Sequence, residues 1–288
     1  MKTKRFIGLF LLLATLTACT KPVDSDHTRI RISYTANGSP LVTDSLCYVN
    51  EAGNRFMVTE IQWFISKVTL VSEQGDEYVF GDVFYIDTNL PETQILTSLS
   101  LPCQKYVTMR FTFGLDEDSN VTGRFPNPPE SNMFWPEPLG GGYHYMKLNG
   151  RYLNENGELA PMNIHLGIGQ NEDHTQFYQN HFSVELPIDL RIEAGKDNLL
   201  CLDMNIDNWF RNPHSYDITT YGSAIMQNQE AQNLLKENGN DVFSIKTIDD
   251  MESLLKISKE LMKKAAPQPH FMTWENLKNT FSNIKNNL

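Results

Sequence analysis

Short runs in which apolar and polar residues alternate fill the chain between residues 28 and 207. Clusters of Gly, Asn, Asp and Pro separate these runs, as they do between strands. Successive side chains of a strand point to opposite faces, so the alternation predicts strands with one buried face. The expected strands span residues 29–34, 46–49, 62–71, 78–87, 106–113, 143–152, 162–167, 182–186 and 199–206.

Many short strands at this spacing are typical of the all-β class and predict an antiparallel β-sandwich with C-terminal helices. No strand and helix patterns alternate, and no glycine-rich phosphate loop follows a strand, which argues against a nucleotide-binding α/β fold. The chain also lacks a G-x-S-x-G elbow and an H-E-x-x-H motif. We therefore expect a binding protein and not an enzyme.

The pattern becomes helical after residue 210. Residues 216–223 and 227–236 favour helices, and apolar stripes with a period near 3.6 predict two more helices, over residues 251–264 and 274–284. These stripes are expected to pack on the sandwich. The predicted organisation is a β-sandwich domain over residues 28–210, followed by a helical C-terminal extension over residues 211–288.

The amino terminus has the features of a bacterial lipoprotein signal peptide over residues 1–18. Positive charges precede an apolar run, and Leu16-Thr17-Ala18-Cys19 forms a lipobox that predicts lipidation of Cys19. The apolar run is shorter than the roughly 20 residues that cross a bilayer, whereas acyl chains on one cysteine give stable anchoring. Residues 19–27 read as a polar tether. Thr20 follows the cysteine where Asp would favour the inner membrane, so we expect an outer-membrane lipoprotein of the cell envelope.

The formal net charge of −11 gives no basic surface for nucleic acid, so no nucleic-acid partner is expected. Three further cysteines, Cys47, Cys103 and Cys201, allow at most one disulfide. None lies in a C-x-x-C arrangement of the kind used by zinc sites and redox motifs.

Candidate metal ligands gather in residues 131–169, which contain Met133, His144, Met146, Met162 and His165. Imidazole with thioether suits copper, particularly Cu(I). In the first of two strands His144 is expected to share a face with Met146 and Leu148, and in the second His165 leaves the apolar face. A turn over residues 154–161 brings the two strands together. The plainer interpretation is that both histidines are hydrogen-bonded sheet residues and the methionines fill the core.

Four motifs resemble those of the MbnP family of methanobactin-associated copper-binding proteins. They are FMVTEIQWFISKVTLVSEQG (residues 56–75), FTFGLDEDSN (111–120), MFW with a glycine-rich link to GYHYMKLNG (133–150), and IHLG (164–167). The resemblance covers about residues 28–210.

This resemblance implies a periplasmic or surface β-domain that binds one copper ion. It also implies a histidine ligand, matched here by His165, and a tryptophan oxidised to kynurenine, matched by Trp135. The oxidation would be carried out by a partner dihaem peroxidase-like protein. An unmodified indole has no lone pair for a metal, so Trp135 contributes only after oxidation. His144 is added from the hairpin geometry as the nearest imidazole that can complete the site.

The chain departs from the family pattern at three places. Pro136 and Glu137 replace a second Trp, Val121 replaces a His, and Gln170 stands where the segment after HLG leads to a Cys. A second function class therefore stays open, that of a surface lipoprotein that has lost the metal site. Such a protein would bind a glycan or protein ligand, with an aromatic platform of Phe134, Trp135, Tyr143 and Tyr145.

Overall fold

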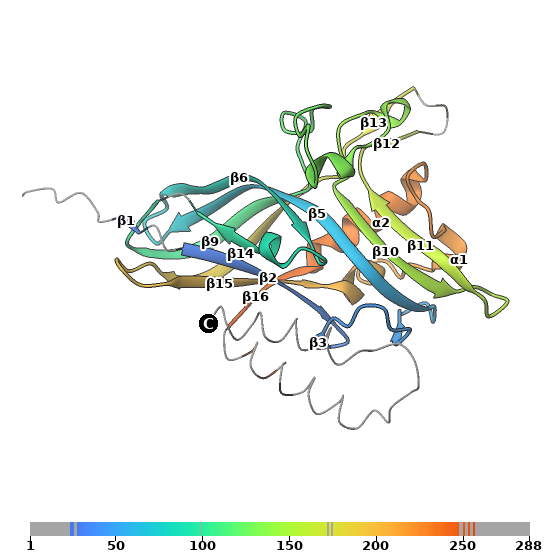
Figure 1. Ribbon diagram of the computed structural model, residues 1–288, viewed down its shortest axis with the longest axis horizontal. Coiled ribbons are helices and arrows are strands. Elements are labelled where there is room, and N and C mark those ends of the chain that lie inside the picture. Colours follow the sequence, from blue (N-terminus) through green and yellow to red (C-terminus); the bar gives the residue numbers. More distant parts are fainter. Residues whose placement is uncertain are drawn as a thin grey trace, which may run out of the picture.

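The fold is an all-β antiparallel sandwich, as predicted, seen in a computed structural model that describes residues 24–25, 28–98, 100–171, 173, 175–247, 250, 253 and 256. The larger sheet has the strand order β11-β10-β5-β9-β14, with β4 and β6 also paired to β5. The second sheet has the order β16-β15-β2-β3, with β7 paired to β2. Figure 1 shows the second sheet lying below the strands of the first.

The strands of the larger sheet are β4 (Tyr48–Val49), β5 (Arg55–Ser72), β6 (Glu77–Asp87), β9 (Lys105–Phe113), β10 (Met146–Leu153), β11 (Leu159–Leu166) and β14 (Phe182–Arg191). Those of the second sheet are β2 (Thr28–Ala36), β3 (Ser39–Pro40), β7 (Ile95–Thr97), β15 (Asn198–Asn205) and β16 (Phe243–Lys246). Two small ladders pair β1 (Asp24–Ser25) with β8 (Leu101–Pro102) and β12 (Gly169–Gln170) with β13 (Phe177–Tyr178).

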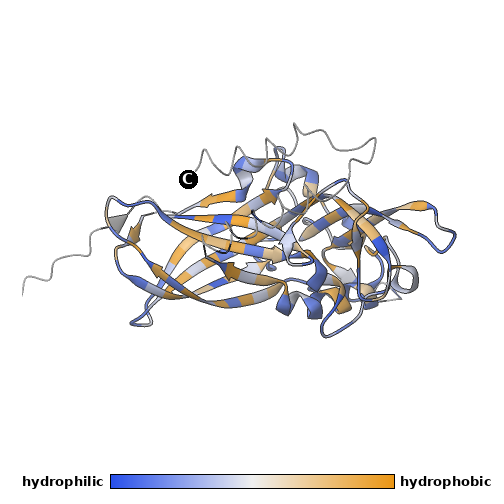
Figure 2. Ribbon diagram, turned by 90° about the horizontal axis from the view of Figure 1, so that it is seen from below, coloured by the Kyte–Doolittle hydropathy of each residue, from blue (hydrophilic) through white to orange (hydrophobic). Residues whose placement is uncertain are grey.

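Strand β5 is the long central strand on which the larger sheet is built. Its first half pairs with β10, from Phe56 to Trp63, and its second half pairs with β9, from Ile65 to Ser72. The β10–β11 hairpin therefore forms an arm that extends beyond β9 and β14 (Figure 1). Apolar and polar residues alternate along these strands (Figure 2), and the buried apolar residues form one hydrophobic core.

Two features of the second sheet differ from the sequence-based expectation. Strands β2 and β15 pair in parallel, whereas the sequence predicted an antiparallel sandwich. They come from opposite ends of the domain, so no hairpin dictates their relative direction. Strand β16, which pairs with β15 through Phe243 and Met204, was not predicted at all, because four residues carry too little periodicity. The chain after residue 210 is therefore not purely helical.

Helices α1 (Ile218–Tyr221) and α2 (Gln229–Asn238) form where helices were expected. The Asn228 side chain caps α2 by accepting a hydrogen bond from the Ala231 amide, which satisfies a free donor of the first turn. Short 3-10 helices complete the described chain: η1 (Pro91–Gln94), η2 (Glu130–Met133), η3 (Glu137–Leu139), η4 (Ile206–Phe210) and η5 (Gly239–Asp241).

Several predictions concern residues that the structure does not describe. The lipobox with Cys19, the tether apart from residues 24 and 25, and the helices expected over residues 251–264 and 274–284, apart from residues 253 and 256, lie outside the described residues. No disulfide joins Cys47, Cys103 and Cys201, and Cys201 is buried. Among the described helices, none combines the length and apolar character needed to cross a membrane.

Candidate metal centre

The segment that joins β9 to β10 carries Trp135 into the core. Helices η2 and η3 fold this segment back on itself, and the Trp135 amide donates a hydrogen bond to the Gly142 carbonyl over 2.9 Å. The Trp135 side chain has no exposed surface, and its indole N–H donates to the Leu139 carbonyl over 3.0 Å. The Trp135 side chain is part of the hydrophobic core.

Gly167, directly after β11, forms the surface on which the Trp135 ring lies. A Cβ atom at position 167 would sit 2.5 Å from Cε3 of Trp135, far closer than carbon atoms approach. The Gly167 backbone is itself held at both polar atoms. Its amide donates to Oε1 of Gln232 over 3.1 Å, and its carbonyl accepts from Nδ2 of Asn180 over 2.8 Å. Both of these amide side chains are fully buried.

His144 lies between Trp135 and His165. Its ring centroid is 4.7 Å from that of Trp135 and 5.1 Å from that of His165, and both contacts are edge to face. The regular strand begins only at Met146, because the chain bends at Tyr145. The predicted alternation of faces therefore does not extend back to His144. Instead its ring meets His165, which leaves the apolar face as predicted, between buried Ile164 and Leu166.

The protonation state of His144 follows from its hydrogen bond. Nδ1 lies 2.9 Å from the Met133 carbonyl oxygen, which can only accept, so Nδ1 carries the proton and Nε2 carries the lone pair. Nε2 is buried and has no hydrogen-bond partner. Burial lowers the pKa of His144 to about 3, so the ring is neutral at physiological pH. A neutral imidazole with a free lone pair is the form that binds metals.

His165 is oriented by a chain of two hydrogen bonds. Its Nε2 lies 2.8 Å from Oδ1 of Asn149, and Nδ2 of Asn149 donates to Glu60 over 3.2 Å. The carboxylate can only accept, so it fixes the Asn149 amide with its oxygen toward the imidazole. The proton of His165 is therefore on Nε2 and the lone pair on Nδ1. Burial, followed by the positive charge of Lys147, lowers the pKa of His165 to about 4.

The arrangement offers two neutral imidazoles with fixed tautomers side by side. That donor set fits a soft ion of low coordination number such as Cu(I), and it does not suit Ca²⁺ or Mg²⁺, which take oxygen ligands. Nowhere in the described ranges do three or more His, Cys, Asp or Glu side chains form a metal-binding group. Trp135, as an indole, adds an N–H donor and no lone pair.

The aromatic platform expected for a glycan-binding or protein-binding lipoprotein is not exposed on the surface. Trp135, Tyr143 and Tyr145 are all buried, and only Phe134, at 43% exposure, faces solvent. The segment folds inward, and the rings of Trp135, Tyr143 and Tyr145 belong to the core. A stacking surface made of these four residues is therefore excluded.

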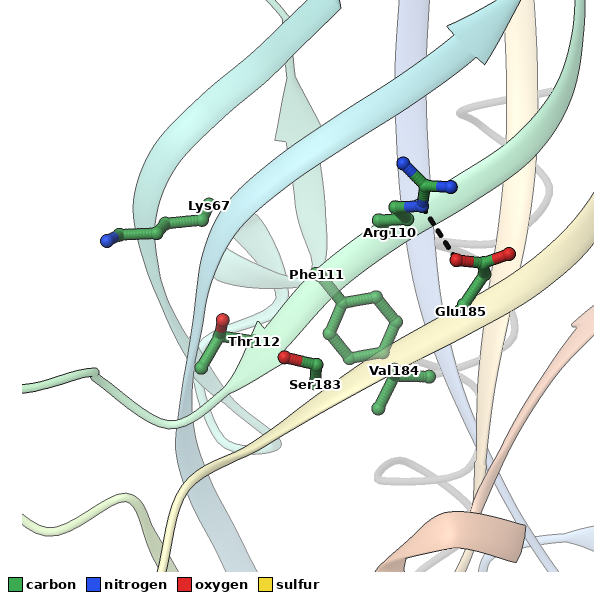
Figure 3. A pocket seen from close by; sticks show the side chains of 7 residues that line it. All are labelled: Lys67, Arg110, Phe111, Thr112, Ser183, Val184 and Glu185. Carbon is green, nitrogen blue, oxygen red and sulfur yellow. Dashed lines mark hydrogen bonds and ion pairs between the residues drawn. The ribbon is translucent and has the colours of Figure 1, made fainter. Parts of the chain in front are cut away.

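A shallow groove on the larger sheet, shown in Figure 3, is lined by residues other than Trp135, His144 and His165. Its cations are already paired, because Arg110 donates to Glu185 over 2.7 Å and Lys67 forms an ion pair with Asp116. The groove is lined by Lys67, Arg110, Phe111, Thr112, Ser183, Val184 and Glu185. It contains none of the predicted site residues and no unpaired charge to attract a ligand.

Sequence reasoning missed the residues that support the histidines. Asn149 and Lys147 alternate with the buried positions of β10, so strand periodicity could have placed them on the face of His165. Gln232 is a polar residue on the buried side of α2, between Ala231 and Leu235, which is itself a signal of a specific partner. Nothing local in the sequence connects Glu60 to this site.

Comparisons with known proteins agree with the motifs. The family model MbnP matches residues 25–228. Among solved structures, MbnP from Methylosinus trichosporium superposes with a TM-score of 0.51 at 14% sequence identity, and the match covers 78% of this chain and 99% of that chain. At this identity the likeness shows the fold alone. A comparison with curated proteins gives no match.

Proposed function

Because this chain belongs to the MbnP family, we propose that it is a copper-binding protein of the bacterial cell envelope. In this proposal His144 Nε2 and His165 Nδ1 hold one copper ion. The function is binding, and the proposal includes no catalytic step.

The single observation that carries the proposal is the unpartnered Nε2 of His144. Leaving a buried acceptor without a partner costs about 1–3 kcal/mol. A hydrophobic side chain of similar shape would avoid that cost, so the imidazole has to be explained by something that uses its lone pair. The ring of His165, whose centroid lies 5.1 Å from that of His144, supplies a second lone pair on Nδ1.

Trp135 enters the proposal through its oxidised form. In this oxidation the indole C2–C3 bond is broken and one oxygen atom from the peroxide-dependent partner is added to each carbon. Hydrolysis then releases C2 as formate, so the net change is the loss of one carbon and the gain of one oxygen. The product, kynurenine, carries a ketone and an aromatic amine beside His144. We propose a dihaem peroxidase-like protein as the partner that carries out this oxidation. The enclosed position of Trp135 against His144, 4.7 Å between ring centroids, would place the new groups next to the copper ion.

The proposal predicts that copper binding depends on both histidines. The full chain should bind Cu(I) weakly when it is made alone, and more tightly after co-expression with the oxidase, when the Trp135 peptide shows the loss of one carbon and the gain of one oxygen. His144→Ala or His165→Ala should weaken binding by roughly a hundredfold or more, because even residues behind a ligand are worth 10–100-fold. Competition titration with a Cu(I) chelator measures the affinity.

Two controls sharpen this experiment. All variants carry Cys47→Ser, since an exposed free thiol is itself a Cu(I) ligand. His214→Ala, which removes a histidine paired with Glu237 on α2, should leave the affinity unchanged. If His165→Ala binds copper as well as the parent under both conditions, the metal site is elsewhere or absent, and a lipoprotein that binds another ligand becomes the better description.

We also propose that Cys19 is lipidated and holds the domain at the outer membrane. The lipobox and the short apolar run support this placement. Cys19→Ala should move the protein from the membrane fraction to the soluble fraction, as judged by immunoblotting after detergent-free fractionation. Cys47→Ser is the matched control and should stay with the membrane. Unchanged partitioning of Cys19→Ala would contradict lipid anchoring.

A further inference from the structure

Lys147 lies beside the candidate metal centre but has no role in the proposed copper binding. Lys147 on β10 pairs directly with His165 on β11. Residues paired across two antiparallel strands place their side chains on the same face, with Cβ atoms about 4.5–5.5 Å apart. The lysine therefore starts on the face of the sheet from which the His165 imidazole projects.

The ammonium group is also held next to His144. Nζ of Lys147 donates to the Asn132 carbonyl over 2.5 Å, while Nδ1 of His144 bonds to the carbonyl of the next residue, Met133. Two consecutive carbonyls of helix η2 thus fix the cation and the imidazole side by side. Lys147 as a whole is half-buried, and its hydrogen bond to Asn132 lies at an exposed position, so solvent screens its charge in part.

The charge of Lys147 is not neutralised locally. Within the described part of the chain, Lys147 has no ion pair, and Glu60 is an acidic group whose charge acts on it. The Glu60 oxygens are occupied by the Asn149 and Asn89 amides, at 3.2 and 2.9 Å. His165 therefore has Lys147 as its cross-strand neighbour, whereas the Glu60 carboxylate reaches its ring only through the Asn149 amide.

A fixed cation beside a metal pocket opposes a divalent ion more strongly than a monovalent one, because Coulomb repulsion scales with the charge of the ion. We infer that Lys147 sets the charge selectivity of the site, favouring Cu(I) over Cu(II) and raising the reduction potential of the bound copper. This inference rests on the proposed copper binding by His144 and His165. In it Lys147 is a specificity residue and not a ligand, since its ammonium has no lone pair.

The test compares variants that change charge with one that keeps it. In the full chain carrying Cys47→Ser, Lys147→Met and Lys147→Gln should raise the affinity for Cu(II) relative to Cu(I) by about tenfold or more. The reduction potential then falls by about 59 mV for each factor of ten. Lys147→Arg, which retains the charge and a donor for Asn132, should stay close to the parent. Potentials come from redox titration of the copper-loaded protein, followed by the Cu(II) electron paramagnetic resonance signal.

Glu60→Gln tests the sign of the effect. The substitution removes a negative charge while its amide oxygen can still accept from Asn149, so the potential should rise where the Lys147 variants make it fall. A merely structural role for Lys147 would not produce opposite shifts. Equal selectivity in parent, Lys147→Met and Lys147→Gln overturns the inference even though copper is bound.

Failure of the proposed copper binding would give a different experimental result from failure of the inference about Lys147. If the parent does not bind Cu(I), or binds it independently of His144 and His165, the proposed site and this inference fall together. If neither neutral Lys147 variant folds, the test is the relative affinity of the parent protein for the two ions, because the inference requires the parent to bind Cu(I) more tightly than Cu(II). A parent that binds both ions equally well contradicts it.

Discussion

Acidification from pH 6.5 to pH 4, without added metal, should destabilise the protein well before its carboxylates are fully protonated. Burial holds the pKa of His144 at about 3 and, with Lys147, that of His165 at about 4, whereas both histidines have a pKa near 6.5 in the unfolded chain. Between these values the unfolded state binds more protons than the folded state. The free energy of unfolding therefore falls as pH falls through 6.5.

The slope of this loss approaches about 1.4 kcal/mol per pH unit for each histidine. It continues down to the folded pKa of each, about 4 for His165 and about 3 for His144, where the folded protein also takes up the proton. Urea unfolding at a series of pH values, without added metal, measures this slope of the free energy of unfolding. Above pH 6.5 both states are neutral at these positions, and their contribution becomes constant.

Replacing the histidines separates their titration from that of the carboxylates. His144→Leu removes the unpartnered Nε2, and the Met133 carbonyl still accepts from the backbone amide of residue 144 over 2.6 Å. The variant should be at least as stable as the parent at pH 7 and lose less stability at pH 5. If His144→Leu and His165→Gln both follow the parent curve, the two imidazoles do not control the acid sensitivity.

Gly167→Ala should be among the most damaging single substitutions in the domain. The new methyl group would meet the Trp135 ring at 2.5 Å, and Trp135 is fully buried. The backbone at residue 167 cannot easily move, because Gln232 and Asn180 hold its amide and its carbonyl. Overpacking of this kind costs about 1–3 kcal/mol or more, which guanidinium unfolding would show as a lower midpoint.

A smaller ring at position 135 should relieve the clash. Alone, Trp135→Phe leaves a cavity in the core. Combined with Gly167→Ala, the smaller ring makes room for the new methyl group. The double variant should therefore lose less stability than the sum of the two single losses. Strict additivity would show that the two side chains do not compete for the same space. Gly157→Ala is a useful contrast, since a Cβ at that turn meets no atom within 4 Å and its cost comes from the positive φ of 75° alone.

The amino-acid sequence by itself determined the fold class and the orientation of His165. Alternation is a local property, and a strand with buried Met162, Ile164 and Leu166 has to direct the residue between the last two to the other face. The same logic gave the expected strands and the helix of α2, whose Asn228 cap and Gly239 end are readable signals. It also predicted that a turn would bring β10 and β11 together.

Only the tertiary structure decided what the candidate site looks like. The bend at Tyr145 turns His144 toward His165, and it depends on backbone hydrogen bonds to Phe64 and Leu166. The tautomer of His165 depends on Glu60, which is 89 positions from Asn149, and the support of Gly167 depends on Gln232, 65 positions away. Periodicity describes which face a side chain takes within one element. Periodicity carries no information about which distant side chain will contact that face. Such long-range contacts bury Trp135, fix the lone pairs of His144 and His165, and place Lys147 beside them.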